Sequence, residues 1–180
     1  WLAERCDGAF ERQVALKLQR RSASPEAAQD LAERLRREVQ LVARLEHPHI
    51  ARLYDTGSDA SGRPFIAMEY VQGLPLDALA PGLQPRARLQ LFLQVLRAVA
   101  YAHERDVVHL DLKPAHVLVD RDGAPHLLDF GIAGLLGQPG TAAATTGASP
   151  AAHTPRYAAP EQRAGQALTA QADVHALGVI

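Results

Sequence analysis

The feature that most constrains this chain is the apolar stretch at residues 109–131, HLDLKPAHVLVDRDGAPHLLDFG, which carries charged side chains at a few places. Within it, HVLV and HLLD flank DRDGA, whose Asp-Gly pair is typical of a tight turn between antiparallel strands. Folding this hairpin about residue 122 brings the ends of its two strands together. We therefore expect His116 and Asp129 at the same open end, with Asp111 and Lys113 entering it from the preceding loop.

Two carboxylates, a lysine and an imidazole would then converge without an obvious internal neutralisation. Such convergence is typical both of structural ion-pair networks and of functional sites, so the pattern alone leaves the two interpretations open.

Composition excludes several classes of function. The chain has 180 residues, 47% hydrophobic and 22% charged, with a formal net charge of −1. This balance gives no basic field for nucleic acid or an anionic membrane, and we expect neither as a partner. Cys6 is the single cysteine, which excludes an internal disulfide and a cysteine-based metal cluster. No uninterrupted apolar run is long enough to span a bilayer.

The chain begins at Trp1 without a methionine and ends within the apolar run DVHALGVI. We therefore expect a fragment of a longer protein. No signal peptide is evident.

Lysine is rare in this sequence. Of 19 lysines and arginines, only Lys17 and Lys113 are lysines. Where arginine dominates, a retained lysine indicates a site that needs a compact ammonium group.

The first part of the chain reads as strands and one helix. Residues 1–18 predict two strands around Asp7-Gly8, and Ser24-Pro25 predicts the start of a helix that runs to about Leu45. Glu38 falls in the apolar stripe of this helix, where a carboxylate is costly unless a cation meets it. Residues 47–57 and 63–71 predict two further strands around a turn at 59–62.

The second part reads as mainly helical. Residues 72–82 are rich in Gly and Pro and are the best candidate for a linker between lobes. A helix is predicted over about 85–105. Its expected buried face comprises Leu89, Leu93, Leu96, Val99, Ala100 and His103. Residues 138–153 are of low complexity, and their composition predicts mobility. This order of elements predicts an α+β protein with two unlike lobes.

Five short motifs and one glutamate, in this order, resemble those of protein kinases, most closely the bacterial Ser/Thr kinases of the eukaryotic type. They are VALK (14–17), Glu38, HLDLKPAH (109–116), DFG (129–131), APE (159–161) and DVHALGV (173–179). The resemblance covers the whole chain. It implies a two-lobed kinase fold truncated at both ends, with a β-rich small lobe at 1–70 lacking its Gly-rich loop and a mainly helical lobe at 71–180.

The resemblance also implies roles for the unusual residues. Lys17 would hold the α- and β-phosphates of ATP, Glu38 would position Lys17, and Asp129 would bind Mg²⁺. Asp111 would orient the substrate hydroxyl and accept its proton, while Lys113 would neutralise charge on the transferred phosphoryl group.

Further residues take roles only through the resemblance. Thr154 would shape the acceptor site beside Asp111 and Lys113. Asp173 would anchor the backbone of the catalytic loop, HLDLKPAH (109–116). Independently of the resemblance, we expect His103 and His109 to be packed core histidines. Around the adenine ring the resemblance implies Met68 as gatekeeper, backbone hydrogen bonds from Glu69 and Val71, and Ala15 and Leu118 against its faces.

Two residues depart from the family pattern. Leu110 replaces an arginine that normally pairs with a phosphate on the activation loop, so control through that pairing is not expected. His116 replaces an asparagine that normally binds a second Mg²⁺, although Mg²⁺ prefers oxygen ligands. Three outcomes stay open for His116: it orients Asp111, it shifts the metal preference toward Mn²⁺, or it leaves a site that binds nucleotide without transfer.

The expected function is a Ser/Thr protein kinase that uses ATP and Mg²⁺, with Mn²⁺ as an alternative, and acts on a protein substrate. The alternative is a pseudokinase, a nucleotide-binding or scaffolding module without chemistry. A small-molecule kinase of the same broad fold is disfavoured by TPRYAAPEQ, which resembles the peptide-acceptor segment of protein kinases. The resemblance implies a cytoplasmic location, including as the cytoplasmic domain of a membrane-anchored parent. The sequence does not indicate an oligomeric state.

Overall fold

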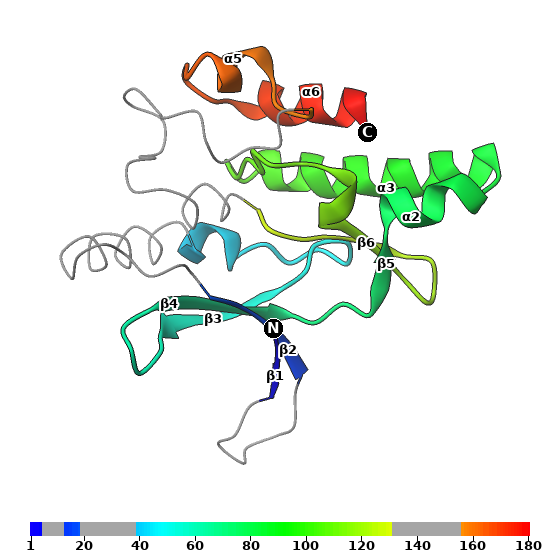
Figure 1. The fold of residues 1–180 in the computed structure, drawn as a ribbon. Coiled ribbons are helices and arrows are strands. Elements are labelled where there is room, and N and C mark those ends of the chain that lie inside the picture. The colour runs from blue at the N-terminus through cyan, green and yellow to red at the C-terminus, as the bar shows by residue number, and fades with distance from the viewer. Residues whose placement is uncertain (5–12, 19–38, 131–155) are drawn as a thin grey trace.

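The computed structural model describes residues 1–4, 13–18, 39–130 and 156–180, and it confirms the predicted α+β class (Figure 1). A four-stranded antiparallel sheet lies at one side, a group of helices lies at the other, and a three-stranded sheet stands between them. Among the described helices, none is long and apolar enough to cross a membrane.

The four-stranded sheet has the order β1-β2-β4-β3, with β1 at Leu2–Glu4, β2 at Gln13–Leu18, β3 at Leu53–Ser58 and β4 at Pro64–Glu69. Ile66 and Met68 of β4 pack with Val39 into a small core under this sheet. The predicted strand over 47–57 is too long, because β3 begins only at Leu53. The backbone of residues 49–51 instead pairs with Leu127 of the second sheet.

The three-stranded sheet has the order β5-β6-β7, with β5 at Gly73–Pro75, β6 at Val117–Asp120 and β7 at Pro125–Leu127. The prediction of a linker over 72–82 is wrong. Residues 73–75 pair with β6, and they are followed by α2 (Leu76–Leu79) and a 3-10 turn, η1 (Ala80–Gly82). Gly73 lies so close to β6 that an added Cβ would stand 2.4 Å from the Val119 carbonyl oxygen. A glycine is therefore needed for the two strands to approach this closely.

The long predicted helix is present as α3, Pro85–His103, but its predicted buried face is largely wrong. Leu89 and Leu93 are 63% and 46% exposed, and Ala100 is also exposed. The residues buried on α3 are Leu91, Val95, Ala98, Val99 and Ala102. This helix carries apolar residues on more than one face, and the hairpin and α6 pack against the face of Val and Ala, where small side chains permit close approach.

Two described helices follow near the C-terminal end, α5 at Pro160–Arg163 and α6 at Ala170–Val179. α6 lies beside α3 and contributes Ala176 and Leu177 to the larger core, which also includes Val117 and Leu127 of the hairpin (Figure 1). Of the helix predicted from Pro25 to about Leu45, the structure describes only the end, where residues 39–42 are helical. The rest of that prediction, the turn at Asp7-Gly8 and the segment 138–153 lie outside the described residues.

Candidate functional site

The open end of the β6–β7 hairpin is built as the sequence predicts. Val117 pairs with Leu127 and Val119 with Pro125, a register that sets residue 116 opposite 128. The Leu128 amide donates a hydrogen bond of 2.8 Å to the His116 carbonyl, which extends the ladder by one step. His116 and Asp129 therefore lie at the same end, with His116 Nε2 3.5 Å from Asp129 Oδ2.

Asp129 is a buried carboxylate with one satisfied oxygen. Its Oδ2 forms an ion pair with Lys17 from β2, and this contact joins the two sheets. Its Oδ1 is buried and has no hydrogen-bond partner among the described residues. The backbone of Asp129 has a φ of 68°, a left-handed conformation that is uncommon for residues other than glycine.

The second buried carboxylate, Asp111, comes from the loop before the hairpin. Its Oδ2 lies 2.7 Å from Lys113 Nζ, with the lysine side chain 22% exposed. A short 3-10 turn, η2 (Pro114–His116), follows directly and carries His116 back toward the same loop. The predicted convergence of the two carboxylates, the lysine and the imidazole is confirmed as geometry.

The His116 ring lies between the two carboxylates. Its Nδ1 is 2.9 Å from the backbone carbonyl oxygen of Asp111 and 3.5 Å from the Asp111 carboxylate. Burial lowers the pKa of the His116 imidazole from its ordinary value, against the opposing effect of the Asp129 carboxylate. His116 therefore orients the loop through the backbone of Asp111 rather than by a direct hydrogen bond to the carboxylate.

Asp173 of α6 fixes the loop that carries Asp111, in agreement with the anchoring role that the resemblance implies. Its carboxylate is 1% exposed and accepts hydrogen bonds from the His109 and Leu110 amides, both at 2.8 Å. It also lies 2.7 Å from His103 Nε2. A buried carboxylate with three donors holds a loop in one conformation because each donor would otherwise be left unsatisfied.

His109 ties the same loop to the hairpin. This residue is fully buried, its Nε2 donates to the Leu128 carbonyl at 2.7 Å, and its Nδ1 accepts from the Asp111 amide at 3.3 Å. Its ring also lies against Phe130, with centroids 4.7 Å apart. The loop that carries Asp111 is thus bound both to α6 and to the strand that leads to Asp129.

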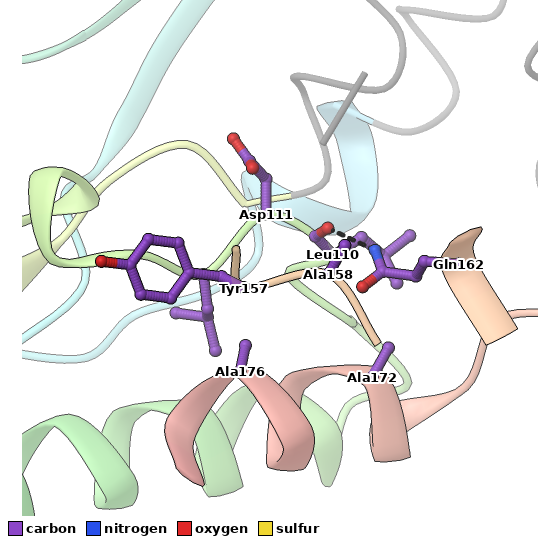
Figure 2. A pocket seen from close by; sticks show the side chains of 8 residues that line it. Leu110, Asp111, Tyr157, Ala158, Gln162, Ala172 and Ala176 are labelled. Atoms are coloured by element: carbon purple, nitrogen blue, oxygen red, sulfur yellow. Dashed lines mark hydrogen bonds between the residues drawn. The ribbon is translucent and has the colours of Figure 1, made fainter. Parts of the chain in front are cut away.

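Gln162 is a positioning residue that the sequence analysis missed. Its Nε2 donates to the Leu110 carbonyl at 2.8 Å (Figure 2), and its Oε1 accepts from the Ala159 amide at 2.9 Å. Leu110 has a φ of 66°, and the bonds from Gln162 and to Asp173 stabilise this left-handed backbone. A local signal for its bond to Ala159 was present. A Gln at the third position of a helix can accept a hydrogen bond from the backbone amide of the residue that precedes the helix.

A shallow recess is formed by the loop that carries Asp111, by α5 and α6, and by the segment before α5. Its lining residues are Leu110, Asp111, Leu112, Tyr157, Ala158, Gln162, Ala172 and Ala176. Asp111 stands at its edge with its carboxylate turned away from α6 (Figure 2).

The residues predicted to surround adenine lie in the four-stranded sheet, in the connection between the two sheets and on β6. Ala15 of β2 pairs with Met68 of β4, and the two side chains pack in the same small core. Glu69 ends β4, and its amide and carboxylate bind the backbone of Arg52. Val71 lies in the connection between the sheets, and Leu118 lies on β6 opposite His126. Glu38 and Thr154 lie outside the described residues.

The side chains at this end of the hairpin are suitable ligands for a divalent cation that binds together with a phosphate. The Asp129 oxygen without a partner is buried, and a buried carboxylate oxygen needs a donor or a cation. Among the described residues, no group of three His, Cys, Asp or Glu side chains is placed to bind a metal alone. Further ligands would therefore come from a bound substrate or water, as is usual for Mg²⁺ at phosphate-transfer sites.

These features define a class of protein that positions charge for phosphoryl transfer, and comparison with known proteins gives the family. The model of the protein kinase domain matches residues 5–180. The chain belongs to this family, whose members generally use ATP and Mg²⁺.

The similar curated proteins are bacterial Ser/Thr protein kinases. A probable serine/threonine-protein kinase of Streptomyces coelicolor is 36% identical over 97% of this chain and 26% of its own length. PrkC of Bacillus subtilis is 34% identical over 100% of this chain and 27% of its own length. The chain thus spans about a quarter of the length of these relatives.

Solved structures agree with the fold. The crystal structure of the Mycobacterium tuberculosis PknI kinase domain has a TM-score of 0.69 and is 32% identical. The match covers 98% of this chain and 63% of that chain. The predicted kinase-like fold is confirmed.

Proposed function

We propose that this chain forms the catalytic part of a Ser/Thr protein kinase that transfers the γ-phosphoryl group of ATP to a protein hydroxyl. The observation that carries the proposal is the meeting of Asp111, Lys113, Asp129 and Lys17 at the open end of one hairpin. Two buried carboxylates with lysine partners are costly as a purely structural device, and a phosphoryl-transfer site needs them.

In the proposed reaction, Asp111 orients the acceptor hydroxyl and takes its proton while the hydroxyl oxygen bonds to the γ-phosphorus. The bond between the γ-phosphorus and the oxygen that bridges to the β-phosphorus breaks, and ADP carries that electron pair away. Lys113 is already 2.7 Å from Asp111, so its ammonium group is near the position where the transferred charge would pass.

Lys17 and Asp129 act on the nucleotide side. Lys17 would bind the α- and β-phosphates, with Glu38 positioning it, and Asp129 would hold Mg²⁺, which supplies charge neutralisation between the phosphates. Met68, Glu69, Val71, Ala15 and Leu118 are the proposed adenine contacts, and Thr154 the proposed residue beside the acceptor.

The connection at 70–72 between the two sheets supports a division into a small lobe at 1–70 and a large lobe at 71–180. The ATP dependence of the reaction supports a cytoplasmic site of action. The segment TPRYAAPEQ (154–162), which resembles the peptide-acceptor segment of protein kinases, is the proposed contact for the protein substrate.

The test is phosphate transfer from labelled ATP by the complete protein and by Asp111→Asn. We expect the variant to lose about 10²- to 10⁴-fold in rate, because it can no longer accept a proton, while ATP binding persists. Asp106→Asn is a matched control, since Asp106 is exposed and its φ of 58° suits asparagine. Transfer by Asp111→Asn at the wild-type rate would contradict the proposal.

A further inference from the structure

The hydrogen bonds of His116 determine where its ring carries a proton. Nδ1 lies 2.9 Å from the Asp111 backbone carbonyl oxygen, which can only accept, so Nδ1 is the donor. In the neutral ring, Nε2 then carries a lone pair. His109, next to it, has the opposite arrangement, because its Nε2 donates to the Leu128 carbonyl.

The lone pair on His116 Nε2 faces another acceptor. Asp129 Oδ2 is 3.5 Å away, and the His116 and Asp129 side chains are only 15% and 5% exposed. The other carboxylate oxygen, Asp129 Oδ1, is buried without a hydrogen-bond partner among the described residues. The Lys17 ammonium group binds Asp129 Oδ2, but Oδ1 has no such partner among the described residues. Acceptors that face one another in a buried place repel unless a positive charge stands between them.

The His116 ring is held in this orientation from two sides. Its side chain is bound to the Asp111 carbonyl, and its own backbone carbonyl accepts the Leu128 amide at 2.8 Å. The imidazole therefore presents Nε2 to Asp129 as a fixed feature of the hairpin end, which is the arrangement expected of a metal-binding histidine whose second nitrogen is oriented by a carbonyl.

We propose that His116 Nε2 and Asp129 together bind a divalent metal ion that enters with the nucleotide, and that this ligand pair favours Mn²⁺ over Mg²⁺. Mg²⁺ demands oxygen ligands and loses water reluctantly, whereas first-row transition metals accept imidazole nitrogen. This inference rests on the proposed kinase function and adds its metal preference.

We expect metal binding to depend on nucleotide, because the protein supplies only two of the ligands that the ion needs. Two side chains cannot saturate such an ion, and no third His, Cys, Asp or Glu completes a group among the described residues. The remaining ligands are phosphate oxygens and water, so Mn²⁺ should bind weakly to the protein alone and tightly in the presence of nucleotide.

The direct test is pulsed electron paramagnetic resonance of Mn²⁺ bound to the complete protein with the β,γ-methylene analogue of ATP. The protein is prepared with natural and with ¹⁵N-labelled histidine. We expect a histidine nitrogen coupling that changes with the isotope in the wild type and disappears in His116→Asn. The matched control, His175→Asn in α6, should keep the coupling.

A second readout is the affinity for the same analogue with Mn²⁺ and with Mg²⁺. We expect His116→Asn to lower the ratio of Mn²⁺ to Mg²⁺ affinities by at least about tenfold, because it exchanges a nitrogen ligand for an oxygen. An unchanged ratio would contradict the proposed preference.

Failure of this inference can be distinguished from failure of the kinase proposal. Binding of the Mn²⁺–nucleotide complex without any histidine coupling in the wild type would overturn the metal site alone, since transfer is measured separately. Binding of the Mn²⁺–nucleotide complex only after His116→Asn would also overturn the metal site. It would mean that His116 Nε2 is protonated in the wild type and cannot bind a metal ion. Absence of nucleotide binding and of transfer in every variant would overturn both proposals.

Discussion

Two hairpins of this molecule have turns of the same type but carry different side chains at their open ends. The β3–β4 turn reads DASGR (59–63) and the β6–β7 turn reads DRDGA (120–124). In each, the first Asp accepts through Oδ1 from the amides two and four residues later, at 2.8 and 3.0 Å for Asp59 and at 3.0 and 2.9 Å for Asp120. Gly62 and Gly123 adopt φ values of 77° and 79°, which glycine permits without strain.

The open ends are quite different. Four residues before the turn Asp, the first hairpin has the exposed Asp55 and the second has His116. Nine residues after it, the first hairpin has the buried Met68 and the second has Asp129. The same turn chemistry therefore specifies a hairpin in both places, whereas function depends on the side chains at the end where the strands leave the sheet.

The largest effect should come from the open end of the second hairpin. Asp129→Asn removes the charge that pairs with Lys17 and that is proposed to bind the metal. We expect a loss of about 10²- to 10⁴-fold in transfer, equivalent to several kcal/mol of charge stabilisation. The same exchange in the first hairpin, Asp55→Asn, should leave transfer unchanged. Equal losses in the two variants would contradict the comparison.

A smaller effect is expected where α6 supports the second hairpin's neighbouring loop. Asp173→Asn leaves one of the buried donors of His109, Leu110 or His103 without an acceptor. The free energy of unfolding should fall by about 1–3 kcal/mol, and transfer by roughly 10- to 100-fold as Asp111 loses its position. Thermal unfolding and transfer rates check both numbers, with the exposed Asp122→Asn as control. Normal transfer despite lowered stability would show that the loop does not depend on this anchor.

The two turns can be broken separately for a smaller effect. Asp59→Ala and Asp120→Ala each remove a carboxylate that binds two backbone amides, and both side chains are 24% exposed. Each variant should lower the melting temperature by a few degrees. Only Asp120→Ala should also slow transfer, because its hairpin holds His116 and Asp129. An equal effect of both variants on transfer would mean that the first hairpin also positions the site.

The smallest effect is the pH dependence of these turns. The Ser61 hydroxyl, followed by the Arg63 backbone, lowers the pKa of Asp59, and the His126 side chain lowers that of Asp120. A carboxyl group whose pKa is lower when folded stabilises the protein above its unfolded value of about 3.9 and loses this contribution as the pH falls. The melting-temperature deficits of the two alanine variants should therefore stay constant above about pH 5 and shrink as the pH falls below about pH 4. Deficits that grow over this range would contradict the assignment.

Local patterns in the sequence were sufficient for much of the fold. The turn signals at 59–62 and at Asp122-Gly123 placed both hairpins, and the register about residue 122 correctly brought His116 to Asp129. The anchoring role expected of Asp173 is likewise confirmed by its two bonds to the loop backbone. These successes depend on contacts that short-range geometry or an ordered set of motifs determines.

The errors arose where non-local packing decides. On α3, the large leucines at 89 and 93 suggested the buried face, but close packing against the hairpin selected the face with Val95 and Ala98. The Gly/Pro-rich segment 72–82 resembled a linker, yet strand β5 pairs with a strand some 45 residues away in sequence. The bond from Gln162 to Leu110 spans 52 residues, so no local pattern could specify its partner.

The bond between Gln162 and Leu110 joins two uncharged groups, an amide and a carbonyl. In the family pattern, the residue at 110 is an arginine whose contact with a phosphate would weaken as salt screens it. A neutral hydrogen bond is much less sensitive to screening. The connection between α5 and the loop that carries Asp111 should thus persist at high ionic strength. Because it involves no phosphate, it should also persist after phosphatase treatment.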